Sequence, residues 1–164
     1  MMKRIYFTKA GFEKFRLETV AIENRLKEAQ SRMQSEAELG GDLWHDNSAY
    51  DQLVIDIRGL DRSLSLNRQI LDLAAIVEPP THFTRVAMGL SARILRDGTE
   101  TNYSIVGYGE SDPDRNALAY NTPLAMLFIG KVVGEVVKGQ IGGKETTIEI
   151  LEISKGGTED VPSP

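Results

Sequence analysis

Five carboxylates gather in one short part of the chain, and they are the side chains whose types and spacing could do chemistry. No lysine or arginine occurs in residues 33–51. The acidic residues of this stretch are Glu36, Glu38, Asp42, Asp46 and Asp51. Carboxylate oxygens are good ligands for hard divalent cations, whereas a run of like charge at a turn is more often a solvated surface. The residues alone leave both interpretations open.

The composition excludes several classes of protein and site. The 164 residues include no cysteine, which excludes disulfides, thiolate metal sites and cysteine nucleophiles. No apolar run approaches the roughly 20 residues of a membrane-spanning helix, and residues 1–8 lack the apolar core of a signal peptide. The sequence pI of about 5.1 argues against broad binding to duplex nucleic acid. We therefore expect a cytoplasmic protein without a membrane partner.

The acidic stretch lies between two segments of helical periodicity. Thr8 suits the N-cap of the first helix, because its hydroxyl can accept a free first-turn N–H, and the glycine pair 40–41 ends that helix. Asp46 and Asn47 are candidate N-caps of the second helix, which we expect to run until the Glu78-Pro79-Pro80 segment.

Both segments carry apolar residues at alternating spacings of three and four, which is the pattern of a coiled-coil seam. The first seam is Phe12, Phe15, Thr19, Ile22, Leu26, Ala29 and Met33, and the second is Tyr50, Leu53, Ile57, Leu60, Leu64, Asn67, Leu71 and Ala74. Two seams joined by a short break bury each other when the helices fold back antiparallel. The sequence therefore predicts a coiled-coil finger over residues 1–78, about 42–45 Å long, with its acidic tip at 40–50.

After the prolines, the pattern changes to short strands separated by turns. We expect strands over 85–96, 101–106, 117–120, 135–141 and 146–153, with a brief helix over 124–129 that begins at Pro123. The fold class is α+β, with an N-terminal antiparallel helical hairpin and a small antiparallel sheet domain at 81–155. Residues 156–164 are rich in Gly, Pro, Ser and acids, which predicts a disordered tail.

Several motifs stand in a specific order along the chain. The tip reads Gly41-Asp42-Leu43, then Asp46-Asn47, then Tyr50, and the C-terminal half contains Tyr103-Ser104-Ile105-Val106-Gly107, Asn121-Thr122-Pro123-Leu124-Ala125 and Ile129-Gly130-Lys131. Together they resemble the Gre family of bacterial transcript-cleavage factors, which bind RNA polymerase. That family has a similar tip motif, Gly-Asp-Leu-x-Glu-Asn-Ala-Glu-Tyr, and a similar strand, Ser-Pro-Ile/Leu loop and Gly-Lys turn. The resemblance covers about residues 5–154.

The resemblance implies a fold, a partner and a role for the tip. The sheet domain would have an FKBP-like fold, and the finger would enter the secondary channel of RNA polymerase. There Asp42 and Asp46 would help to hold a second Mg²⁺ at the polymerase active site and promote cleavage of the nascent RNA at its 3′ end. The Mg²⁺ would be bound only within the complex, and the polymerase would supply the main catalytic machinery. The protein would then be no enzyme itself, and we expect a monomer.

The resemblance also implies a docking surface on the sheet domain, around the loop and short helix at 121–131. The residues assigned to it are Asn121, Thr122, Pro123, Leu124, Gly130 and Lys131. Trp44 at the tip is a further candidate contact, although it could instead pack back on its neighbours. His45 could act as a ligand or a proton carrier, but an exposed loop histidine usually does neither.

The tip departs from the family pattern in two ways. Trp44-His45 replaces a single residue, and Asp46 stands where the family has a glutamate, one methylene longer. The carboxylate oxygens of Asp46 could instead accept hydrogen bonds from backbone N–H groups as a helix N-cap, which would make Asp46 a poorer metal ligand. Two alternatives therefore stay open: a polymerase-binding regulator or inhibitor of the same shape, and a coiled-coil adaptor without polymerase contact. Prolyl isomerisation is disfavoured, because the aromatic residues after Pro80 show no clustered pattern.

Overall fold

The computed structural model describes residues 3–39 and 48–156. The chain forms two compact units. The first unit comprises Met1–Arg4 and Glu13–Ala74, and the second comprises Ile5–Phe12 and Ala75–Pro164.

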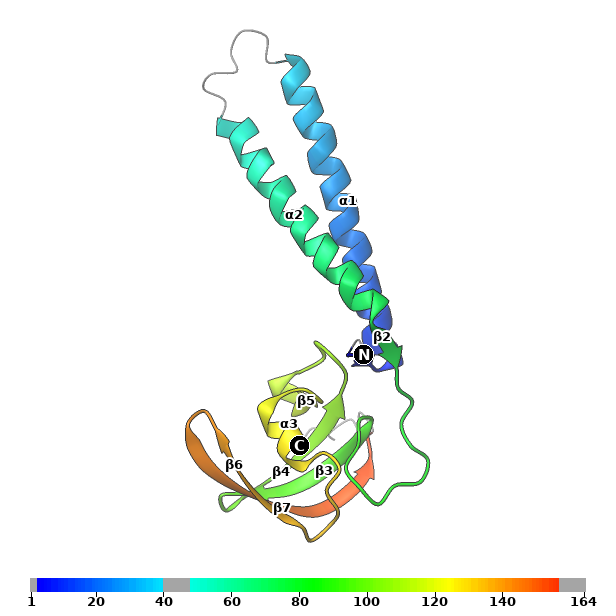
Figure 1. Ribbon diagram of the computed structural model, residues 1–164, viewed down its shortest axis with the longest axis vertical. Helices are drawn as coiled ribbons and strands as arrows, with labels where there is room; N and C mark the ends of the chain where they lie inside the picture. The colour runs from blue at the N-terminus through cyan, green and yellow to red at the C-terminus, as the bar shows by residue number, and fades with distance from the viewer. Residues whose placement is uncertain (1–2, 40–47, 157–164) are drawn as a thin grey trace, which may run out of the picture. The chain divides into compact units, whose positions relative to one another are not determined.

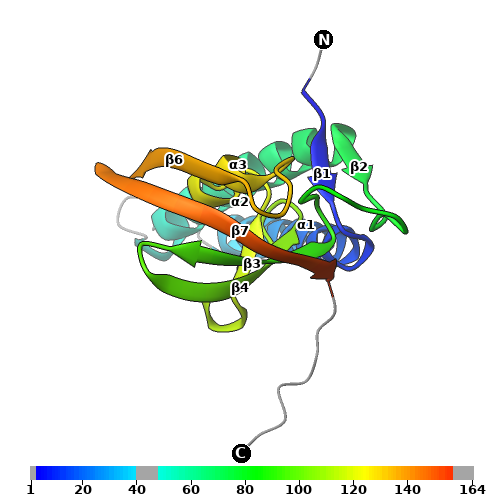
Figure 2. The same cartoon turned by 90° about the horizontal axis from the view of Figure 1, so that it is seen from below.

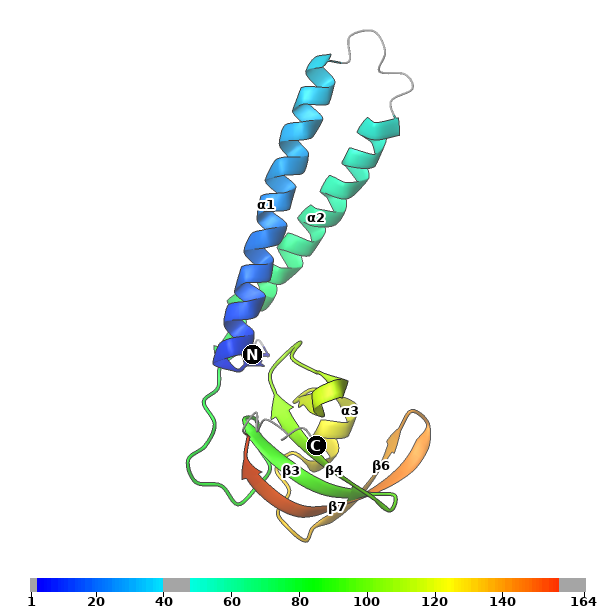
Figure 3. The ribbon, with the colours of Figure 1, turned by 180° about the vertical axis from the view of Figure 1, so that it is seen from behind.

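The first unit is a pair of long helices, α1 (Lys9–Leu39) and α2 (Ser48–Asp72). Figures 1 and 3 show the two helices side by side and antiparallel. Every residue of the two predicted seams is buried or half-buried, with Leu26, Leu53 and Leu64 each less than a tenth exposed. The periodicity therefore identified the faces that meet, and an antiparallel helical hairpin is confirmed. Neither helix, over the residues described, is long and apolar enough to cross a membrane.

The first helix starts as predicted, and the second ends earlier than predicted. The Thr8 hydroxyl accepts a hydrogen bond from the Gly11 N–H (3.0 Å), which makes Thr8 the N-cap. Helix α2 ends at Asp72, six residues before Glu78, and the chain then enters strand β2 (Ala74–Ile76). The expectation of a helix up to Glu78 was wrong. Strand β2 pairs with β1 (Ile5–Phe7), a partner that the local sequence pattern does not reveal.

The second unit is built on a five-stranded sheet with the order β5-β4-β3-β7-β6. Its strands are β3 (Leu90–Arg96), β4 (Thr99–Val106), β5 (Ala117–Ala119), β6 (Val136–Ile141) and β7 (Lys144–Lys155). All neighbouring pairs are antiparallel except β4 and β5, which are parallel. Figure 2 shows β6 and β7 as one long hairpin beside β3 and β4. Strand β3 is shorter than the predicted run from residue 85, because the positive φ of Gly89 (86°) interrupts the extended backbone.

A helix covers one face of this sheet and completes the core. Helix α3 (Pro123–Phe128) contributes Ala125 and Phe128, both with no exposed surface, and these pack with Ile94, Ile105 and other strand residues. Figure 2 shows α3 lying against the sheet. The α+β class is confirmed, with a helical hairpin and a small sheet domain that carries one short α-helix among the residues described.

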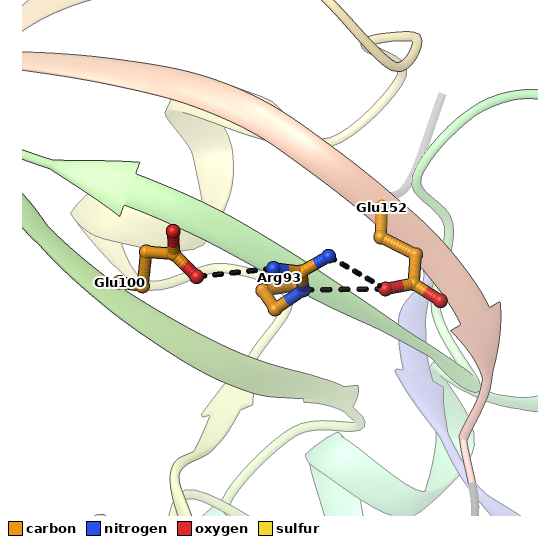
Figure 4. Close-up of polar contacts among 3 residues, drawn as sticks. All are labelled: Arg93, Glu100 and Glu152. Atoms are coloured by element: carbon orange, nitrogen blue, oxygen red, sulfur yellow. Dashed lines mark hydrogen bonds and ion pairs between the residues drawn. The ribbon is translucent and has the colours of Figure 1, made fainter.

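The opposite face of the sheet is polar and carries a cross-strand ion group, drawn in Figure 4. The Arg93 Nη2 lies 2.9 Å from the Glu152 Oε2, and the Arg93 Nη1 lies 3.0 Å from the Glu100 Oε2. The hydrogen bonds that Arg93 donates to Glu152 and then to Glu100 raise the pKa of Arg93 above its ordinary value. The three side chains come from β3, β7 and β4, so the group links three adjacent strands on the exposed face of the sheet.

Candidate functional site

The predicted tip site lies outside the residues that the structure describes. Asp42, Trp44, His45 and Asp46 all fall in residues 40–47, so their roles stay predictions. The structure does describe the two helix ends that flank them, Leu39 of α1 and Ser48 of α2. Within residues 3–39 and 48–156, no group of three or more metal-ligating side chains lies close together.

The predicted docking segment is described in full, and its N-terminal part is held by Thr122. The Thr122 hydroxyl donates a hydrogen bond to the Ala119 carbonyl (2.8 Å) and accepts one from the Ala125 N–H (3.4 Å). Pro123 occupies the first helical position, where a backbone N–H would have no intrahelical partner. Both contacts of the hydroxyl lie within the unit, so Thr122 positions the segment by capping α3.

The C-terminal part of the segment is a turn that is anchored from two sides. Gly130 has φ +80°, a left-handed conformation that favours glycine. Its N–H donates to the Val86 carbonyl (2.8 Å), and its own carbonyl accepts from the Arg85 Nη1 (3.0 Å). The Lys131 Nζ lies 3.0 Å from the Glu135 Oε1. The Lys131 charge is therefore already paired within the unit.

Glu135 gives this turn a pH dependence. Its Oε2 accepts a hydrogen bond from the Val132 N–H (3.1 Å), and this bond, followed by the Lys131 side chain, holds the pKa of Glu135 below its ordinary value. Because the pKa of Glu135 is lowered in the folded protein, its carboxylate stabilises the fold at pH values above the ordinary carboxyl pKa. That stabilisation is lost as the pH falls through the lowered pKa. We expect Glu135→Gln to lower the melting temperature at pH 7, with a difference from wild type that shrinks below about pH 4. Thermal melts from pH 3 to pH 7 check this, and a difference that does not change with pH would contradict it.

An apolar hollow of about 350 Å³ opens beside α3. Its lining residues are Tyr6, Val77, Met88, Tyr120, Met126 and Ile129. The rings of Tyr6 and Tyr120 meet edge to face with centroids 5.6 Å apart, and the Tyr6 N–H donates to the Tyr120 hydroxyl (3.2 Å). These six side chains include no carboxylate, imidazole or amine. The hollow is therefore suited to bind an apolar group.

Two features of this surface were not predicted from the sequence. Met126 is 67% exposed, the most exposed of the large apolar side chains described, and it was not assigned to docking. Met126 lies two residues before the buried Phe128, which places it on the opposite face of the helix. This spacing could have predicted that Met126 is exposed. The pairing of Tyr6 with Tyr120 carries no local signal, because the two residues are 114 positions apart.

The predicted docking residues differ in what they can offer a partner. Asn121, Pro123 and Gly130 are exposed, whereas Leu124 is half-buried and packs against the core, and Lys131 is half-buried and paired. An exposed rim of this kind around an apolar side chain such as Met126 has the composition of a protein-binding surface.

Comparison with known proteins finds relatives that share one name and cover more than nine-tenths of the chain. Residues 80–155 match the family model described as the C-terminal part of the transcription elongation factors GreA and GreB. The chain is 32% identical over 158 residues to the transcription elongation factor GreA of Nautilia profundicola, with 94% of each chain covered. It is 33% identical over 155 residues to the transcription elongation factor GreA of Shouchella clausii, with 92% of this chain and 97% of the relative covered.

Among solved structures, the chain is similar to the GreA factor homolog 1 (Gfh1) protein of Thermus thermophilus. The identity is 19% and the TM-score 0.44, with 92% of this chain and 99% of that chain covered. A structural overlap of this size adds nothing to what the sequence relatives show.

Proposed function

This chain belongs to the GreA/GreB family of transcription elongation factors, and from that premise we propose that it binds RNA polymerase and stimulates cleavage of backtracked nascent RNA. The observation that supports the proposal most is identity of 32–33% with relatives named GreA over more than nine-tenths of the chain. The helical hairpin adds support, because residues 40–47 connect its two helices and contain the two aspartates of the tip motif.

In this proposal the finger enters the secondary channel of the polymerase, and Asp42 and Asp46 reach its active site. A carboxylate pair is a suitable donor set for Mg²⁺, which prefers oxygen ligands and retains part of its water. Asp42 and Asp46 would be the residues of this chain that hold a second Mg²⁺, which would supply charge stabilisation for phosphodiester hydrolysis. The two aspartates would supply negative charge at that place and orient water through their oxygens. The chain would thus act in trans, with the polymerase as the enzyme and the RNA 3′ end as the substrate.

The second unit would dock on the polymerase surface through the loop at 121–131 and through α3. Met126 supplies an exposed apolar side chain there, and the hollow beside it can accept one from the partner. Trp44 would be a further contact at the tip. Docking of the second unit matters because a long helical hairpin is inserted productively only when another part of the same chain is held on the polymerase.

We expect Met126→Glu in the full chain to weaken polymerase binding by about tenfold or more, since a charge would be buried in an apolar contact. The fold should be unchanged, because the side chain points to solvent. Val136→Glu is the matched control, because Val136 is 55% exposed but lies on β6. A competition assay against the wild-type chain measures the affinities. Equal affinities for Met126→Glu and Val136→Glu would contradict docking through α3.

A second candidate function is a polymerase-bound inhibitor. The observation that favours it is the additional residue between Asp42 and Asn47, which lengthens the tip relative to the family motif. A backtracked elongation complex with an extruded RNA 3′ end distinguishes the two functions. The proposed function requires faster cleavage in Mg²⁺ when the protein is added. Slower cleavage or slower nucleotide addition would instead establish the inhibitor.

A further inference from the structure

The helical hairpin contains one polar layer among its buried seam residues, formed by one side chain from each helix. Thr19 of α1 is only 5% exposed, and its Oγ1 accepts a hydrogen bond from the Asn67 Nδ2 of α2 (3.2 Å). The same hydroxyl donates to the Phe15 carbonyl (2.9 Å). Thr19 and Asn67 are the single polar residues of their seams, and they contact each other across the hairpin.

The seam residues on both sides of this layer are apolar. In an antiparallel pair, moving one heptad along α1 and one back along α2 brings Leu26 opposite Leu60. Contacts among leucine, isoleucine and alanine tolerate a shift of one heptad, because an apolar residue still faces an apolar residue. The polar layer does not tolerate it. A shift of seven residues would set Thr19 against Leu60 or Ala74. The Thr19 hydroxyl would keep its bond to the Phe15 carbonyl, but the Asn67 amide would lose its partner in the hairpin, which is penalised.

The connection between the helices is too long to fix their register. It comprises the eight residues 40–47, and a chain of that length can span up to about 26–29 Å. A shift of one heptad displaces one helix along the other by only about 10 Å. At the other end of the hairpin, β1 and β2 pair with only one residue between each strand and its helix, so that pairing and the contacts between the helices together set the register.

A surface ion pair is a further contact between the two helices that could contribute to the register, and it is weaker. The Arg68 Nη2 lies 3.4 Å from the Glu23 Oε2, but the Arg68 side chain is 58% exposed. Water can solvate both charges when such a pair separates, so its loss is penalised little. Thr19 is buried and Asn67 is half-buried, so water replaces the Thr19–Asn67 hydrogen bond less readily.

We propose that Thr19 and Asn67 are positioning residues that lock the register of the hairpin and thereby fix how far the tip segment projects. The register lock itself is a property of the free protein. Its consequence for RNA cleavage rests on the proposed function, because a shift of about 10 Å would carry Asp42 or Asp46 away from a reacting phosphate.

Cross-linking of the full-length protein tests the register of the hairpin without polymerase. Because the sequence contains no cysteine, only the introduced cysteines can react. Glu23→Cys with Arg68→Cys reports the observed register. Glu23→Cys with Asp61→Cys, and Gln30→Cys with Arg68→Cys, report a shift of one heptad in either direction. Each pair is introduced into the wild-type chain, into Thr19→Val/Asn67→Leu, and into Thr19→Ser as the matched control that keeps the hydroxyl. A short bismaleimide then joins cysteines that are neighbours, and intramolecular products are counted.

We expect wild type and Thr19→Ser to cross-link only through the pair at 23 and 68. The Thr19→Val/Asn67→Leu chain should gain shifted products by about tenfold or more, although its apolar seam should make it melt at a higher temperature. Shifted products that stay at the wild-type level in Thr19→Val/Asn67→Leu would overturn the proposal. This result would leave the proposed function intact, since RNA cleavage by the wild-type protein is measured separately.

Discussion

Asp42→Asn and Asp46→Asn are each expected to remove most of the stimulated RNA cleavage while leaving polymerase binding unchanged. Asparagine keeps the bulk of aspartate and removes the negative charge that would be presented to Mg²⁺ in the transition state. By analogy with the removal of one oxyanion donor, the loss is about 2.7–4 kcal/mol, or 10²–10³ in rate. We expect Asp42 to be the more sensitive of the two, because it keeps its family position directly after Gly41, whereas Asp46 follows the additional residue.

Asp51→Asn is the matched control for the two tip variants. Asp51 lies in the first turn of α2, is exposed, and belongs to the same acidic stretch. A solvated carboxylate of this kind should change the rate of cleavage very little. If Asp42→Asn and Asp46→Asn both behave like Asp51→Asn in a wild-type protein that does stimulate, the carboxylates are only part of a solvated turn. Glu36, Glu38 and His45 would then be the next candidates.

The helical half of the fold could be predicted because its information is local. Spacings of three and four identify a buried face without any knowledge of the partner, and all fifteen seam residues are buried or half-buried. Thr8 and Pro123 were also predictable, since a cap and a first-turn proline act on residues within one helical turn. The polar members Thr19 and Asn67 were visible as interruptions of their seams. Their contact with each other required the register, which periodicity does not supply.

The features that could not be predicted depend on residues that are far apart in sequence. Helix α2 ends at Asp72 because the following residues pair with β1, some 70 positions earlier. The apolar hollow requires Tyr6 and Tyr120 to meet, and neither is marked by its neighbours. The docking segment at 121–131 stays a prediction, and burial and pairing decide which of its side chains remain available to a partner. Leu124 and Lys131 are partly used within the unit, and Met126 is free to contact a partner.

Glu110 is a further residue whose role depends on distant partners. Its Oε1 accepts a hydrogen bond from the Thr8 N–H (2.9 Å), and its Oε2 accepts one from the Thr8 hydroxyl (2.6 Å). The carboxylate therefore supports the N-cap of α1 from 102 positions away, where negative charge also suits the helix dipole. Gly11 and Gly107 leave the space for this side chain, since a Cβ at either position would overlap with its carboxylate.

The two glycines Gly107 and Gly59 should respond to alanine in opposite directions. A Cβ at Gly107 would lie 2.7 Å from both the Phe7 Cα and the Thr8 backbone nitrogen, in addition to displacing Glu110. Backbone atoms in a packed strand cannot move aside as a flexible side chain can, so Gly107→Ala should lower the free energy of unfolding by about 1–3 kcal/mol. Gly59 lies within α2, and a Cβ there would meet nothing within 4 Å.

Gly59→Ala should therefore raise the free energy of unfolding by about 0.5–1 kcal/mol, because alanine loses less backbone entropy than glycine in a helix interior. Urea unfolding of both variants measures the two changes, with far-ultraviolet circular dichroism reporting the helices and tyrosine fluorescence reporting the sheet unit. Gly11→Ala should fall between them, since its helix propensity improves while the Glu110 carboxylate is pushed off Thr8. A Gly107→Ala protein as stable as wild type would mean that Glu110 and β1 do not hold the start of α1 as the structure describes.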